Sequence, residues 1–164
     1  MLFLIESLIL CAIFTVVILI PLAKDPASMI MSFPVNVRKR VESLPQYKDK
    51  IKKKESNHIL VKIVGAVVIV FILSVVAYYS GATTFGKAFF YVFFLFFVAN
   101  LYDLFILDLA IFMNCKRFWV PGTEDMVEEY RNPLFYTIGA GKGIIIGFFI
   151  ALLSAGLIQL IHYI

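Results

Sequence analysis

The chain has 164 residues, is 62% hydrophobic, contains 17 Phe and carries a formal net charge of +4. A water-soluble domain of this size could not bury so much apolar surface, because small folds leave a large share of their area exposed. The composition therefore excludes an ordinary soluble domain and indicates an integral membrane protein. In such a protein the positive charge is a topology signal, and we expect no nucleic-acid partner.

Four long apolar segments follow one another along the chain. Each has the roughly 17–25 residues needed to cross about 30 Å of hydrocarbon. They predict transmembrane helices over about residues 2–23, 59–79, 88–113 and 134–161. We expect the first to be a retained helix and not a cleaved signal peptide, because no basic residue precedes it and Glu6 lies in its first turns. We therefore expect one domain over residues 1–164, an all-α membrane protein built as an antiparallel four-transmembrane-helix bundle.

Basic residues concentrate in two of the three connections. The loop over residues 24–58 is rich in Lys and Arg, and the loop over residues 114–133 contains three more cations. The connection between the second and third helices has only Lys87. Because basic loops stay cytoplasmic, we expect both basic loops inside and both the N-terminus and the C-terminus outside. The predicted location is the cell (plasma) membrane, as a multi-pass protein of a bacterial inner membrane.

The first basic loop contains an expected short amphipathic cytoplasmic helix. Val37, Val41 and Leu44 have i, i+4, i+7 spacing, and Pro45 would end the helix. We expect this helix to lie on the membrane, with nearby cations against the anionic inner leaflet. These cations are Arg38, Lys39, Arg40, Lys52, Lys53 and Lys54. For these cations we prefer a plain topology signal, and a specific lipid or partner site is the alternative. Trp119 in the second loop is interpreted as an interfacial anchor.

The third helix carries Asn100, Asp103 and Asp108 in an otherwise apolar stretch. An intramembrane carboxylate costs roughly 2.5–3.5 kcal/mol on insertion scales and indicates a functional site by default. Counting from the loop ends places Asp108 at the depth of Lys142 on the fourth helix, so we expect an ion pair between them. Asp103 lies about 7.5 Å deeper, with no obvious cation. These four residues form the predicted polar interior, and a structural clasp that fixes helix register is the alternative.

Small residues recur at i, i+4 spacing on the first and fourth helices. The two stripes are Ser7, Cys11 and Thr15, and Gly139, Gly143 and Gly147. Such stripes let helix backbones approach closely, so we expect them to be helix-packing surfaces.

The sequence lacks the spacing of a metal site, a phosphate-binding loop or a nucleophile motif. On the expected topology Cys11 and Cys115 are far from each other, and His58 and His162 lie at opposite membrane faces. We therefore expect no catalytic residues, no metal and no cofactor, and the sequence favours a function other than catalysis.

A set of segments distributed over the chain forms a recognisable pattern. They are Phe33-Pro34 with residues 37–44, then Asn100, Asp103 and Asp108, then residues 120–124, Tyr130, and Lys142-Gly143. Together they resemble an uncharacterised family of small bacterial four-helix integral membrane proteins, which implies a topology and no activity. The stretch from Tyr130 to Tyr136 is similar to an Arg-(His/Asn)-Pro-x-Tyr motif of membrane phospholipid and isoprenylcysteine methyltransferases, with one extra residue before Tyr136.

Three functions remain open at this point. In the first, the polar interior serves small-solute, cation or proton transport, with Asp103 as the titrating group and Lys142 as the counter-ion of Asp108. Four helices enclose little volume, so this function implies a homo-oligomer. In the second, the chain is an accessory or scaffold subunit of a larger membrane complex, which works through its cytoplasmic loops. A lipid-modifying membrane enzyme is the third.

Overall fold

The computed structural model describes residues 1–163, apart from the side chains of residues 49, 50, 52–58 and 162. Every element within this part of the chain is helical, and none is a strand. Four helical stretches among these residues are long and apolar enough to cross a membrane: Leu2–Lys24, Ile59–Tyr79, Phe85–Phe112 and Val127–Ile161. The prediction of an all-helical chain with four long apolar helices is therefore confirmed.

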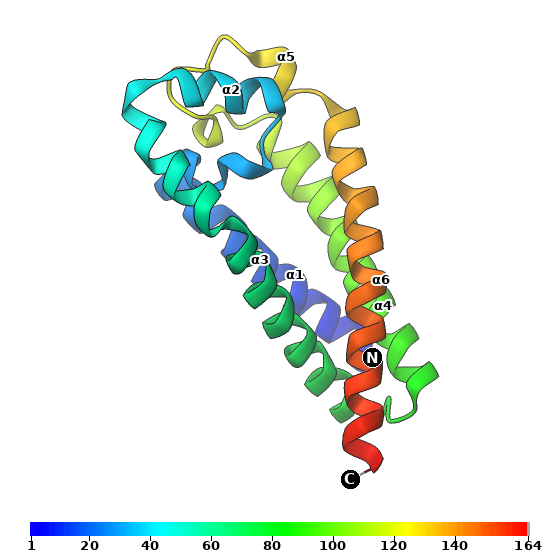
Figure 1. The fold of residues 1–164 in the computed structure, drawn as a ribbon. Helices are drawn as coiled ribbons and strands as arrows, with labels where there is room; N and C mark the ends of the chain where they lie inside the picture. The colour runs from blue at the N-terminus through cyan, green and yellow to red at the C-terminus, as the bar shows by residue number, and fades with distance from the viewer. Residues whose placement is uncertain (164) are drawn as a thin grey trace.

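Long helices connect two different ends of the molecule (Figure 1). Both termini lie toward one end, and the short helices α2 (Val35–Ser43) and α5 (Val127–Tyr130) lie at the other. Two short elements, η1 and η3, are 3-10 helices, and η2 is a π-helix. In chain order the elements are α1 (Leu2–Lys24), η1 (Pro26–Ser32), α2 (Val35–Ser43), α3 (Pro45–Tyr79), α4 (Phe85–Tyr102), η2 (Asp103–Phe112), η3 (Lys116–Phe118), α5 (Val127–Tyr130) and α6 (Pro133–Tyr163).

Helix α3 is longer than the sequence analysis predicted. The expected helix began at residue 59 after a loop over residues 24–58, whereas α3 begins at Pro45. A proline suits the first helical turn because its missing N–H would have no partner there. Pro45 therefore begins α3 in addition to ending α2, and most of the expected loop is helical.

Buried apolar side chains form two clusters. The helical core lies between α3, α4 and α6 and includes Val92, Leu95 and Ile158. The other cluster, which we call the cap core, lies around α2 and the connection before α6. Its members are Leu22, Ala27, Ile30, Phe33, Val37, Val41, Ile51, Leu104, Phe112, Trp119, Val120, Tyr130 and Tyr136.

Helix α2 forms where its spacing predicted, but its apolar face is not free. Val37 and Val41 are completely buried in the cap core, while Lys39 and Arg40 are exposed. An apolar face that packs against the protein is not available to a bilayer. The expectation that α2 lies on the membrane through this face is therefore wrong.

Trp119 is part of the cap core, with only 3% of its surface exposed. Its ring stacks on Tyr130 with centroids 4.5 Å apart and an interplanar angle of 5°. Its Nε1–H donates to the Phe112 carbonyl at 3.1 Å. The Tyr130 hydroxyl accepts the Val120 N–H at 3.1 Å and bonds the Thr123 hydroxyl at 2.8 Å. An interfacial anchor needs an exposed ring, so the prediction for Trp119 is wrong.

Candidate functional site

The third apolar helix changes its geometry where its two carboxylates lie. Helix α4 ends at Tyr102, and the ten-residue π-helix η2 continues it from Asp103 to Phe112. The Met113 N–H donates to the Asp108 carbonyl at 3.0 Å, which is the i→i+5 bond of a π-helix. Such helices are rare, usually a single turn, and frequent at functional sites. The backbone therefore marks this segment as the candidate site.

The π geometry places Asp103 and Asp108 on one face. In an α-helix, residues five apart are rotated by about 140° from one another. In a π-helix residues five apart lie about one turn from one another, so their side chains point toward the same side of the helix. Exposure along η2 follows this spacing, because Leu107 and Phe112 are both buried and Asp103 and Asp108 are both half-buried.

Neither carboxylate has a hydrogen-bond or ion-pair partner among the side chains that the structure describes. Asp108 is within electrostatic reach of Asp103 and of Tyr136, whose hydroxyl donates to the Tyr130 carbonyl at 2.9 Å. Carboxylates at membrane depth require a partner or water. Two carboxylates that interact electrostatically disfavour each other's charged form, so such a pair can take up a proton.

Lys142 does not join this pair. Its side chain is exposed, and it forms no ion pair within the described part of the chain. The cause is helix rotation, because Gly143 faces Asn100 and the preceding residue of an α-helix points about 100° away. The expected Asp108–Lys142 ion pair is therefore not formed, and equal depth alone was not enough to predict it.

Two hydrogen bonds anchor the start of η2 to other helices. The buried Asn100 side chain donates from Nδ2 to the Ala140 carbonyl of α6 at 3.0 Å. Two residues further along, the Tyr102 hydroxyl bonds the Thr15 hydroxyl of α1 at 2.8 Å. Both bonds lie within three residues of Asp103, so they fix its position relative to α1 and α6.

The glycine stripe of α6 contacts α4 at two of its three positions. A Cβ on Gly143 would lie 2.1 Å from Asn100 Oδ1, and one on Gly147 would lie 2.5 Å from Phe96 Cδ1. Gly139 has no other atom within 4 Å of such a Cβ. On α1, Ser7 and Cys11 are buried, as a packing stripe requires, and Thr15 is half-buried.

Glu6 is held by two hydroxyl groups that sequence reasoning did not single out. The Ser80 hydroxyl donates to Glu6 Oε1 at 2.5 Å, and the Tyr91 hydroxyl donates to Oε2. These bonds join α1 to the end of α3 and to α4. The partners are 74 and 85 residues away in sequence, so no local pattern could reveal them.

The predicted surface cations divide into two groups. Arg38 is half-buried beside Glu42, and Lys39 and Arg40 are exposed. The side chains of Lys52, Lys53 and Lys54 lie outside the described residues.

Within the residues that the structure describes, no three His, Cys, Asp or Glu side chains gather in a way that could hold a metal ion. No protein-family model, curated protein or solved structure matches the chain. Functional interpretation therefore rests on the geometry around η2.

Proposed function

We propose that this chain is a multi-pass protein of the cell membrane in which Asp103 and Asp108 bind a proton or a small cation during transport. One observation carries the proposal. The two half-buried carboxylates have no partner among the described side chains, and the π-helix places them on one face. Charged groups at this depth are costly, and they are typical of ion and proton pathways.

The orientation of the proposed protein follows from its charges. Lys39 and Arg40 are exposed on α2, which lies at the end of the molecule opposite both termini (Figure 1). Since cytoplasmic segments are enriched in Lys and Arg, α2 and the cap core belong inside and both termini outside. This arrangement corresponds to four antiparallel transmembrane helices.

The two carboxylates occupy the border between the two cores. Leu104 and Phe112 of η2 belong to the cap core, whereas Leu95 and Phe96 of α4 belong to the helical core. A cation on Asp108 would face the cap, and one on Asp103 would lie one turn deeper. The proposed transport step is the passage of a proton or cation between these two positions.

A flux assay in proteoliposomes tests the proposal. Wild-type protein would be compared with Asp103→Asn across pH 5 to 8, for protons and for small monovalent cations. Asp125→Asn is the matched control, because Asp125 is an exposed acid outside the apolar helices. We expect Asp103→Asn to abolish the flux and Asp125→Asn to retain it. A flux that is unchanged in Asp103→Asn would exclude Asp103 as the coupling residue.

The surface around α2 and α5 supports a second function, that of an accessory or scaffold subunit in a homo-oligomer or a larger membrane complex. The Asn36 amide donates to Glu129 Oε1 at 2.6 Å and joins the basic helix α2 to the acidic segment around α5. Lys39 and Arg40 remain exposed beside this contact. If no ion or metabolite is transported, and a partner co-purifies with wild type but not with Lys39→Gln/Arg40→Gln, the scaffold function is favoured.

A further inference from the structure

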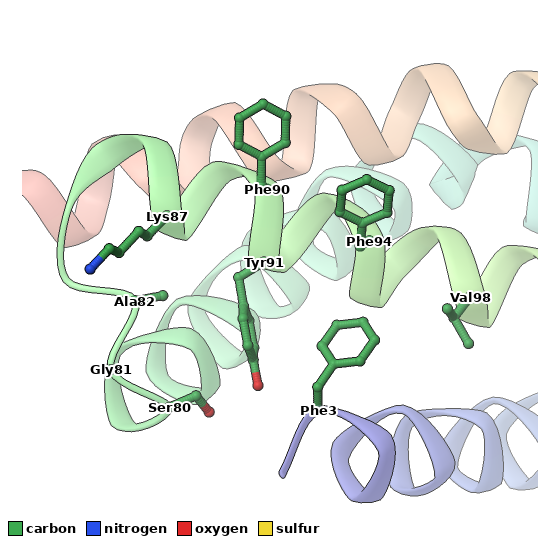
Figure 2. Close-up of a pocket in the computed structure, with 9 residues that line it drawn as sticks. All are labelled: Phe3, Ser80, Gly81, Ala82, Lys87, Phe90, Tyr91, Phe94 and Val98. Carbon is green, nitrogen blue, oxygen red and sulfur yellow. The ribbon is translucent and has the colours of Figure 1, made fainter. Parts of the chain in front are cut away.

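An open groove of about 620 Å³ lies near the end of the molecule that carries the termini. Figure 2 shows its walls, formed by α1, the turn after α3 and one side of α4. Most of the lining is apolar. Lys87 lies at the end near the turn, and Val98 lies at the other end (Figure 2). The residues used below are Phe3, Tyr91, Phe94, Val98 and Lys87.

The length of the groove matches one leaflet of a bilayer. Lys87 and Val98 are 11 residues apart in sequence, and this separation corresponds to about 16 Å along a helix. Half of a hydrocarbon core about 30 Å thick is about 15 Å. The groove therefore extends from the headgroup level at Lys87 to about the middle of the membrane at Val98.

Lys87 provides a positive charge at the headgroup end. Its side chain is exposed, and it forms no ion pair within the described part of the chain. The carboxylate of Glu6 accepts hydrogen bonds from Ser80 and Tyr91, and no ion pair between Glu6 and Lys87 forms within the described residues. A lysine near a membrane surface attracts anionic lipid headgroups, and its aliphatic stem can lie along apolar surface.

These features define a ligand with one anionic end and one long apolar end. We propose that the groove holds a single phospholipid, with an acyl chain along Phe3, Phe94 and Val98 and the phosphate at Lys87. The inference depends on the proposed insertion of the chain in a membrane. It does not depend on transport through Asp103 and Asp108.

Native mass spectrometry of the full chain in detergent tests this assignment, with phosphatidylglycerol as the added probe. The matched control for Lys87→Gln is Lys62→Gln, because Lys62 is also exposed but lies on α3 away from the groove. We expect one tightly bound phosphatidylglycerol per wild-type chain. Loss of one favourable charge should weaken it about fivefold in Lys87→Gln and leave Lys62→Gln unchanged. Diacylglycerol with the same acyl chains should bind more weakly and show no dependence on Lys87.

A second variant tests the deep end of the groove. Val98→Trp should fill the space of the acyl chain and weaken both lipids, while the charge at Lys87 stays in place. Equal binding by wild type and Lys87→Gln, or an equal loss in Lys62→Gln, would overturn the proposal. A chain that retains the lipid but transports nothing would leave this site intact and refute the transport function. Flux without lipid retention would support the transport function and refute the lipid site.

Discussion

Replacing Gly143 with Ala tests the contact that sets α6 against α4 beside the carboxylates. The new Cβ would lie 2.1 Å from Asn100 Oδ1 and 3.0 Å from Asn100 Cγ. The Asn100 amide is buried and donates to the Ala140 carbonyl, so it cannot rotate away without losing that bond. Gly139→Ala is the matched control, since its Cβ meets no other atom within 4 Å.

The magnitude follows from the difference between the two variants. Each gains about 0.5–1 kcal/mol from replacing a helical glycine by alanine, and this gain cancels in the comparison. Overpacking at residue 143 costs about 1–3 kcal/mol. Loss of the Asn100 hydrogen bond costs about 0.5–1.5 kcal/mol. Gly143→Ala should therefore unfold with a free energy about 1.5–4.5 kcal/mol below that of Gly139→Ala.

Trp119 gives a direct assay because it is the only tryptophan and is buried in the cap core. Its fluorescence would follow chemical unfolding of each variant in detergent. Asn100→Ala should remove most of the clash, so Gly143→Ala should cost less in that background than in wild type. Equal stability of Gly143→Ala and Gly139→Ala, or strict additivity with Asn100→Ala, would refute the contact.

Three further predictions follow from other contacts. Tyr130→Phe should lower the free energy of unfolding by about 1–3 kcal/mol, measured by the same fluorescence, because the Val120 N–H and Thr123 hydroxyl lose a buried partner; no loss would contradict the observed bonds. Lys142→Met should change that free energy of unfolding by less than about 0.5 kcal/mol, since Lys142 is exposed and has no ion-pair partner among the described side chains. A large loss of stability would instead indicate that Lys142 pairs with Asp108. Backbone N–H groups of Glu124 and Gly122 hold the pKa of the Glu124 carboxyl below its usual range. The ionised carboxylate therefore stabilises the turn fully at pH values above its usual pKa range, and this stabilisation is lost as pH falls through the lowered pKa. Hydrogen exchange at the Gly122 amide should accelerate, relative to an unstructured amide, over this acidic window in wild type but not in Glu124→Gln.

The long apolar helices could be predicted because hydrocarbon leaves few alternatives. A backbone that crosses a membrane must satisfy its own hydrogen bonds, so an apolar run of sufficient length becomes a helix. The start of α3 was not predicted because this part of the helix is not apolar. The segment after Pro45 is polar and was interpreted as a loop, although Lys, Glu and Gln are good helix formers and no helix breaker follows.

The candidate site was only partly visible in the sequence. Asp103 and Asp108 stand out because each is a charge within an apolar stretch. Their common face depends on the π-helix, which a period of 3.6 residues cannot predict. The rotation of Lys142 away from Asp108 and the burial of Trp119 depend on tertiary contacts. Depth and composition are properties of one segment, whereas these outcomes depend on which neighbour each face meets.

The cap core takes part in shaping the candidate site because it holds one end of η2. The last carbonyl groups of a helix have no partner within it, and the Trp119 indole satisfies that of Phe112. At the other end, the Asn100–Ala140 and Thr15–Tyr102 bonds fix the helix to α6 and α1. The π segment with Asp103 and Asp108 lies between these anchors. Since Leu104 and Phe112 of η2 pack in the same cap core as Val37 and Val41 of α2, we expect substitutions in the cap core to affect the segment that carries Asp103 and Asp108.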